Sequence, residues 1–363
     1  MSAIRSGQAT AFFMYDVADA IDLQTVRSLT THTVAARLAP RPPTPAYVQY
    51  KEPPLSIDGD AVGVAEIAGF HVRFKIFDYG VVSVALTHPV PPTWPELVAH
   101  GLKWHDDAHF VPQAEKACRT LVKRLAPAMT APREHLVTED YLVFTLTDVD
   151  DAPSAEALLA AHGSEIAQLL RGEREPLSAQ ERDDVLRHRI SYLVNDLVVP
   201  TWNAALVYDT EAGAQAAIEI LEFANSQLLE FRYYDGLLDA ELARIYAQLQ
   251  VTGWFQNWPG RRYTRAARQV HALFIDVNEL TDKTENALKI AGDVYAARLF
   301  GIAAARLGLD HWKANVREKL KTLDDIYRFA VEQTSMARGE ILELTIVAIL
   351  MFELVLILMG IMR

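Results

Sequence analysis

The sequence predicts an α+β protein: a small antiparallel, ferredoxin-like N-terminal domain, a mainly helical second half, and a long coiled-coil hairpin ending in a C-terminal transmembrane helix. Three observations lead to this prediction. Residues 72–76 alternate apolar and basic side chains, which is typical of a half-buried strand. Residues 316–344 repeat apolar or small side chains in steps of four and three, which indicates a coiled coil. Residues 341–362 are apolar for about the length that a bilayer requires.

The N-terminal domain is expected over residues 1–150, in the order strand, helix, two strands, helix, strand. An aromatic run at residues 10–17 predicts the first strand, and residues 22–38 have helical spacing. Four prolines in residues 39–46 predict a linker. Val72, Phe74 and Ile76 mark the next strand, and a turn at Gly80 leads into residues 81–86. A helical region then ends near residue 127, and residues 141–147 form the last strand. This order is compatible with a ferredoxin-like layer.

The helical domain is expected over residues 151–281. Residues 154–172 and 177–194 predict helices, the second begun by a Ser178 cap with Glu181 three residues on. Pro200 leaves residues 198–208 ambiguous between a strand and a buried helix, whereas residues 214–250 are strongly helical. A coiled-coil stalk is expected over residues 282–340, with Gly308 separating its two helices.

The last helix of the stalk has a heptad seam that continues without a phase break into the apolar tail. Its members are Val316, Leu320, Leu323, Tyr327, Ala330, Thr334, Ala337, Ile341 and Leu344. Such a seam is typical of an antiparallel hairpin within one chain and equally of a stalk between several chains, and both can hold together.

The tail, residues 341–362, predicts a membrane anchor because 22 helical residues reach across about 30 Å of hydrocarbon. The alternative is a helix buried in a soluble core or at an oligomer interface, which Glu343 and Glu353 favour because a charge at mid-bilayer is costly. Glu353 is expected to turn toward a neighbouring helix, which favours self-association. The N-terminus has no signal-peptide pattern. We therefore expect a single C-terminal span in a bacterial inner membrane, lipid as a partner, and the body of the chain in the cytoplasm.

Composition restricts the class of protein. The net charge of −12 argues against a general nucleic-acid binder, because phosphate neutralisation needs a basic face. Cys118 is the only cysteine, which excludes disulfides within the chain and a cysteine-based metal cluster. The sequence indicates no cofactor.

Several segments together resemble a known family. They are the strand pair FKIFDYGVVSVAL, the helical YYDGLLDAELARIYAQL, the charged helix REKLKTLDDIYRFAVEQTSMARGEILEL and the tail IVAILMFELVLIL. In their order they resemble the required-for-meiotic-nuclear-division and Sad1-interacting-factor family, with Glu343 and Glu353 as the two glutamates of its anchor. The resemblance implies a membrane-anchored, oligomeric protein without established catalytic activity. The mitochondrial members of the family support translation at the inner membrane as tethers.

Two segments are weak candidates for chemistry. His105 and His109 stand four residues apart, as in the metal-binding histidine pair of zincins, although a solvated polar bend explains them as well. Residues 254–268 interleave aromatic and basic side chains and could bind RNA, phosphate or anionic lipid, whereas a Pro-Gly turn with buried tryptophans is the simpler explanation. The binding candidates there are Trp254, Trp258, Arg261, Arg262, Arg265 and Arg268.

The sequence thus predicts a tail-anchored scaffold or tether that acts by homo-oligomerisation and has no catalytic activity. Two alternatives belong to other classes. One is an RNA- or ribosome-binding adaptor that uses residues 254–268. The other is a metal-dependent hydrolase centred on His105 and His109.

Overall fold

The computed structural model describes residues 3–29, 33–35, 53–64, 66–67, 69–105, 110–150, 154–249, 275, 277–278 and 294–358. The chain divides into two compact units. Unit 1 comprises residues 1–233 and 280–313, and unit 2 comprises residues 234–279 and 314–363.

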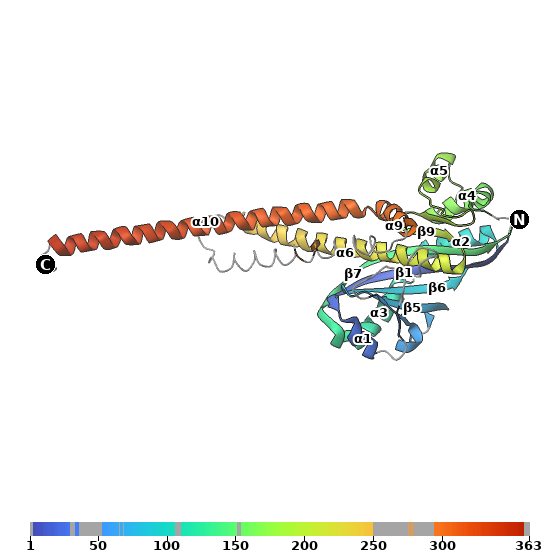
Figure 1. The fold of residues 1–363 in the computed structure, drawn as a ribbon, viewed down its shortest axis with the longest axis horizontal. Helices are drawn as coiled ribbons and strands as arrows, with labels where there is room; N and C mark the ends of the chain where they lie inside the picture. The colour runs from blue at the N-terminus through green and yellow to red at the C-terminus, as the bar shows by residue number, and fades with distance from the viewer. Residues whose placement is uncertain are drawn as a thin grey trace. The chain divides into compact units, whose positions relative to one another are not determined.

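Unit 1 is built on one mixed sheet of nine strands in the order β2-β3-β5-β6-β1-β7-β9-β8, with β4 pairing β5 (Figure 1). The strands are β1 (Ile4–Ile21), β2 (Thr33–Ala35), β3 (Leu55–Asp58), β4 (Glu66–Ile67), β5 (Phe70–Ile76), β6 (Val81–Pro89), β7 (Met129–Val149), β8 (Leu197–Pro200) and β9 (Ala204–Tyr208). Neighbouring strands are antiparallel except β7 and β9, which are parallel. The long strand β1 lies at the centre, between β6 and β7.

The predicted small ferredoxin-like domain is therefore wrong. The sheet is larger and mixed, and β8 and β9, which follow residue 150, complete it beside β7. These two short strands are buried along their whole length. Because strands covered on both faces lack the apolar and polar alternation of a half-buried strand, their pattern resembles that of a buried helix.

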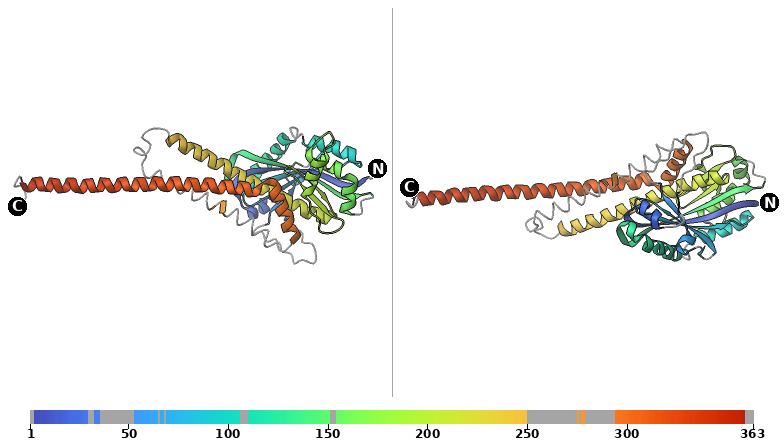
Figure 2. Two further views of the ribbon diagram at one scale, coloured as in Figure 1. Left: turned by 90° about the horizontal axis from the view of Figure 1, so that it is seen from above. Right: turned by 60° about the horizontal axis from the view of Figure 1, so that its bottom comes forward.

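Helices cover both faces of the sheet in unit 1. The helices α2 (Trp94–His105), α3 (Val111–Leu125) and α4 (Ala155–Arg171) pack on the face to which Phe13, Phe74 and Val84 belong. The short helices α1 (Leu23–Leu29) and α5 (Ala179–Arg187) contribute buried residues to the same core. On the other face lie the first part of α6 (Glu211–Leu249) and α9 (Val294–Leu307) (Figure 2). The rings of Phe223 on α6 and Phe300 on α9 have centroids 5.8 Å apart.

The local signals at helix ends are confirmed. Ser154 Oγ accepts a hydrogen bond from Ala157 N at 3.1 Å, and Gly172 ends α4 in the left-handed conformation. Ser178 Oγ accepts from Glu181 N at 3.2 Å to begin α5. Gly308, with φ 68°, separates α9 from α10 (Leu309–Leu358), as glycine commonly does after a helix.

Unit 2 consists, within the described residues, mainly of the last part of α6 and most of α10. The predicted coiled-coil hairpin is wrong in its pairing. Asp235 and Glu241 of α6 contact Lys319 and Tyr327 of α10, in that order, so the two helices run parallel. The helix α9, expected in the stalk, packs on β8 in unit 1 instead. The sequence could not show this, because a heptad seam defines which face of a helix is buried but not which helix covers it.

The predicted transmembrane helix at residues 341–362 is also wrong. Across the part of the chain that the structure describes, no helix combines the length and the apolar content that a bilayer crossing needs. The membrane localisation and the tail-anchored architecture that depended on this span are overturned by the same finding. The physical reason is that charged groups interrupt this apolar segment: Glu353 stands near its middle, where a charge costs about 2.5–3.5 kcal/mol on insertion scales.

Candidate functional site

The two helices of unit 2 are held together by an apolar seam. On α10, Val316, Leu320 and Leu323 are at most 1% exposed. On α6, Leu238 and Ile245 are buried to the same extent. Burial of an aliphatic side chain of this size contributes about 1.5–3 kcal/mol, so the seam stabilises the parallel pairing over this stretch.

Polar contacts flank this seam and fix its register. Lys319 Nζ lies 2.7 Å from Asp235 Oδ1 and 2.6 Å from Asp239 Oδ1. The Tyr327 hydroxyl donates to Glu241 Oε1 at 2.6 Å. Glu241 also accepts from Arg244, and this hydrogen bond holds the pKa of Glu241 below its usual value. Because these partners are specific in position, a slip of α10 along α6 would break them.

The register shows how far, among the described residues, α6 accompanies α10. Lys319 pairs with Asp235, and Tyr327 pairs with Glu241. A residue of α10 thus lies opposite the residue of α6 whose number is lower by 84 to 86. Since α6 ends at Leu249, its end lies opposite about residue 334 of α10. The helix α10 continues to Leu358, which is on the order of 35 Å further at 1.5 Å per residue.

An exposed apolar segment lies in this continuation. We call residues 346–352 the apolar end of α10. Its large side chains, each between 49% and 64% exposed, are Ile346, Val347, Ile349, Leu350, Met351 and Phe352. Because successive residues of a helix turn by about 100°, seven in a row point in every direction around the axis. A helix that is apolar all round is normally buried on all sides, so this segment is the candidate interaction site.

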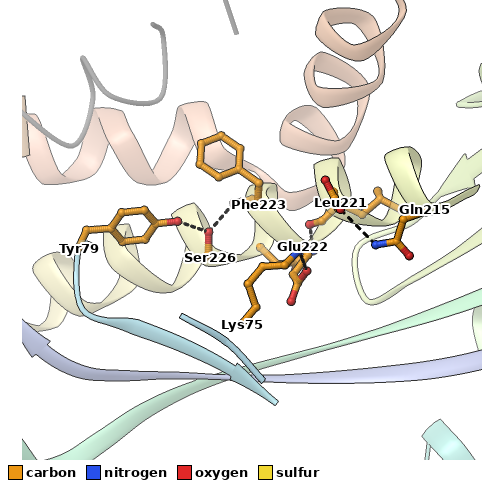
Figure 3. Close-up of polar contacts among 9 residues, drawn as sticks. Lys75, Tyr79, Gln215, Leu221, Glu222, Phe223 and Ser226 are labelled. Carbon is orange, nitrogen blue, oxygen red and sulfur yellow. Dashed lines mark hydrogen bonds and ion pairs between the residues drawn. The ribbon is translucent and has the colours of Figure 1, made fainter. Parts of the chain in front are cut away.

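A second polar arrangement lies in unit 1, between the sheet and α6 (Figure 3). Lys75 of β5 forms an ion pair with Glu222 of α6, and both side chains are nearly inaccessible, at 4% and 1% exposed. One turn earlier, Glu219 accepts from Gln215 Nε2 at 3.2 Å, and burial raises the pKa of Glu219. Buried charges need such partners, because desolvation of an unpaired ion costs several kcal/mol.

Two further contacts hold the same face of α6. The Tyr79 hydroxyl, in the turn between β5 and β6, lies 2.7 Å from Ser226 Oγ (Figure 3). Arg133 of β7 lies 2.8 Å from Asp16 Oδ1 and stacks on the Tyr233 ring at 4.0 Å. Desolvation, which Arg133 only partly offsets, raises the pKa of Asp16 to about 7. These groups position α6 on the sheet.

The structure describes one member of the predicted histidine pair. His105 lies at the end of α2, where its Nε2 is 2.9 Å from the carbonyl oxygen of Leu169 and its ring packs under Gly172. His109 lies outside the described residues. Within the described ranges, no group of three or more His, Cys, Asp or Glu side chains could hold a metal. Through its contacts with Leu169 and Gly172, His105 packs the end of α2 against the end of α4.

The other predicted site residues fall in different places. The aromatic and basic patch of residues 254–268 lies outside the described residues, and so do the side chains of Ala330, Thr334, Ala337 and Glu343. Glu353 is exposed at the end of the apolar segment. Cys118 is buried in α3, and burial raises the pKa of its thiol, so the thiolate that a reactive cysteine needs is disfavoured.

Sequence reasoning missed the buried Lys75–Glu222 pair. Lys75 was assigned to the polar, solvent-facing side of an alternating strand, and Glu222 lies 147 residues away along the chain. The sequence carried one signal of buried polar contacts, which is the number of polar residues on successive turns of this otherwise apolar helix. These residues are Glu219, Glu222, Asn225, Ser226, Gln227 and Glu230.

Fold and site together define a class of protein: a mixed-sheet domain covered by helices on both faces, together with a separate pair of parallel helices, one of which has an exposed apolar end. The chain belongs to the family described as "Uncharacterized protein MJ0711, N-terminal domain", whose model matches residues 6–215. The match thus covers most of the sheet domain and ends near the start of α6.

Comparison with curated proteins adds one relative. The chain is 24% identical over 220 residues to the uncharacterized protein MJ0711 of Methanocaldococcus jannaschii, which covers 60% of this chain and 65% of the relative. The chain therefore spans somewhat less than two thirds of that relative's length. No solved structure matches the chain significantly.

Proposed function

We propose that this protein is a non-catalytic scaffold that assembles with further copies of itself through the apolar end of α10. The observation that supports the proposal most directly is the exposure of all six large apolar side chains in residues 346–352. In the part of the chain that the structure describes, α6 ends at Leu249, before α10 reaches these side chains. A monomer would leave these side chains in water, which is unusual for a contiguous apolar surface.

A second copy of the chain is the occupant that fits this segment best. With 49% to 64% of each side chain exposed, the six side chains present on the order of 600 Å² per chain, which is somewhat less than the roughly 800 Å² that each partner buries in a standard interface. A helix that is apolar all round needs neighbours on several sides, which a symmetric bundle of identical helices supplies. The sheet domains would then be presented in several copies, so that weak binding by each is strengthened by avidity.

The decisive experiment measures molar mass in solution without detergent. The full chain is compared with a version that ends at Gly339 and with the double variant Val347→Glu, Leu350→Glu. We expect a defined oligomer for the full chain and monomers for the other two, with unchanged circular dichroism per residue of the sheet domain. A matched control places a glutamate at the exposed position Lys321 of α10, which should leave the oligomer intact.

Two outcomes would overturn the proposal. A full chain that is monomeric at 100 µM would exclude self-association as its role. Binding of the monomer to phosphatidylglycerol vesicles, lost in the double variant, would assign the apolar end to a lipid surface instead.

The other predicted functions have less support. The RNA- or ribosome-binding adaptor rests on residues 254–268, of which the structure gives no description, and it stays a prediction that salt-dependent RNA binding would test. The metal-dependent hydrolase has no third ligand among the described residues. The resemblance to the required-for-meiotic-nuclear-division family also stays a prediction, and its oligomeric scaffold role agrees with the one proposed.

A further inference from the structure

A groove lies between α4 and α5 in unit 1, away from the contacts described above. Its volume is about 470 Å³, within the range of sites that bind small molecules. Leu159, Gly163 and Leu186 form the apolar part of its wall, and Arg182 and Arg189 contribute charged groups. Its size and its mixed wall suit a ligand with one apolar and one polar end.

The backbone of α4 is bent at this groove. His162 has φ −130° and ψ 15°, which is outside the helical region, although the residues on both sides are helical. Its ring stacks on Trp94 of α2 with centroids 4.4 Å apart and an interplanar angle of 14°. At Gly163 an added Cβ would lie 3.2 Å from Leu186 Cδ1, so the helices approach closely there. Because sharp bends in helices have local causes, we attribute this one to the Trp94 stack and the glycine.

Among the described residues, the two guanidinium groups of the groove make three hydrogen bonds. Arg182 donates through Nε and one terminal nitrogen to Asp183 Oδ1, at 3.1 and 2.9 Å. Arg189 donates to the carbonyl oxygen of Leu186 at 2.6 Å. These contacts use three of the about ten N–H donors that two guanidinium groups carry. With Asp183 as the acidic side chain of the wall, its net charge is positive.

We propose that this groove binds a small organic oxyanion, whose charged group is held by Arg182 and Arg189 and whose apolar body lies against Leu159 and Leu186. Guanidinium groups present paired donors that match the oxygens of a carboxylate or a phosphate. The site is separate from the apolar end of α10, so it would add ligand binding to a scaffold and does not depend on the scaffold proposal.

The test is a titration of the full chain followed by calorimetry, with phenyl phosphate, benzoate and inorganic phosphate as probes. We expect saturable binding of phenyl phosphate or benzoate, and the stronger of the two identifies the oxyanion. Inorganic phosphate should bind at least tenfold more weakly than phenyl phosphate, because it lacks the apolar body. The variant Arg182→Gln should weaken binding at least tenfold.

Two further variants separate the groove from general electrostatics. Arg187→Gln removes the same charge from α5 at a side chain that is 67% exposed and outside the groove, and it should leave the affinity unchanged. Ala161→Phe fills the groove without changing its charge and should abolish binding. The proposal is overturned if none of the three probes saturates, or if Arg187→Gln weakens binding as much as Arg182→Gln.

Discussion

The buried Lys75–Glu222 pair allows a sharp test of how α6 is held on the sheet. Replacing Lys75 by Met leaves the Glu222 carboxylate 1% exposed and without its cation. Loss of one partner of a buried ion pair costs about 3–5 kcal/mol, a large part of the 5–15 kcal/mol that stabilises a typical domain. With a denaturant dependence of about 3 kcal/mol per molar urea, the unfolding midpoint should fall by roughly 1–1.7 M.

The double variant Lys75→Met, Glu222→Leu should recover most of this loss, because replacing both charges by apolar groups removes the desolvation cost together with the attraction. The assay is urea unfolding at pH 7, followed by circular dichroism and tryptophan fluorescence. Lys116→Met, at an exposed position of α3, is the control and should change stability by less than about 0.5 kcal/mol. A single variant that costs under 1 kcal/mol, or a double variant that costs the sum of the singles, would refute the reasoning.

Three further predictions concern local features of unit 1. The folded state keeps the Asp16 proton up to about pH 7, whereas the unfolded chain releases it near pH 4, so stability should fall by on the order of 2–4 kcal/mol over this window. Urea titrations at several pH values should show this fall for the natural chain and its absence in Asp16→Asn. Gly80 has φ 94°, and an added Cβ would overlap the carbonyl oxygen of Ala18. The variant Gly80→Ala should therefore lower the free energy of unfolding by about 2 kcal/mol or more, and an unchanged midpoint in a thermal melt would contradict this. Ser154→Ala removes the cap on Ala157 N and should cost about 1 kcal/mol, which Ser154→Asp should restore.

Local features of the fold could be predicted from the sequence, and the arrangement of the sheet could not. Alternation at Val72, Phe74 and Ile76 predicted β5, and the Ser178 cap predicted the start of α5. Both signals act within a few residues of the chain, so they survive in any tertiary setting. The parallel pairing of β7 with β9 joins segments about 60 residues apart, and no local pattern specifies it.

The candidate site shows the same limit. The apolar residues 346–352 were visible in the sequence, but an apolar helix suits a bilayer, a core and an oligomer interface alike. The register of Lys319 and Tyr327 on α6 adds what the sequence lacked, because it shows that α10 continues beyond the described end of α6. The groove between α4 and α5 could not be predicted, because it lies at the bend at His162 and no sequence pattern in α4 indicates that bend.

The contrast between the two polar arrangements on α6 supports this interpretation of the molecule. In unit 1 the pair Lys75–Glu222 is dry, so moving α6 on the sheet would expose two unpaired charges to an apolar layer. In unit 2 the cluster around Lys319 is partly open, with Asp239 60% exposed, and surface pairs of this kind contribute only about 0–1 kcal/mol each. These ion pairs therefore hold α6 firmly on the sheet but contribute little in unit 2, whose stability comes mainly from buried apolar side chains such as Leu238 and Leu320. If copies of α10 associate through residues 346–352, the energy of that association adds to the stability of unit 2, so dilution of the oligomer should loosen the contacts of Lys319 and Tyr327 before it affects the sheet domain. Hydrogen exchange at 1 µM and 100 µM protein would measure this order, and simultaneous loss of protection in both units would show that the second unit gains nothing from assembly.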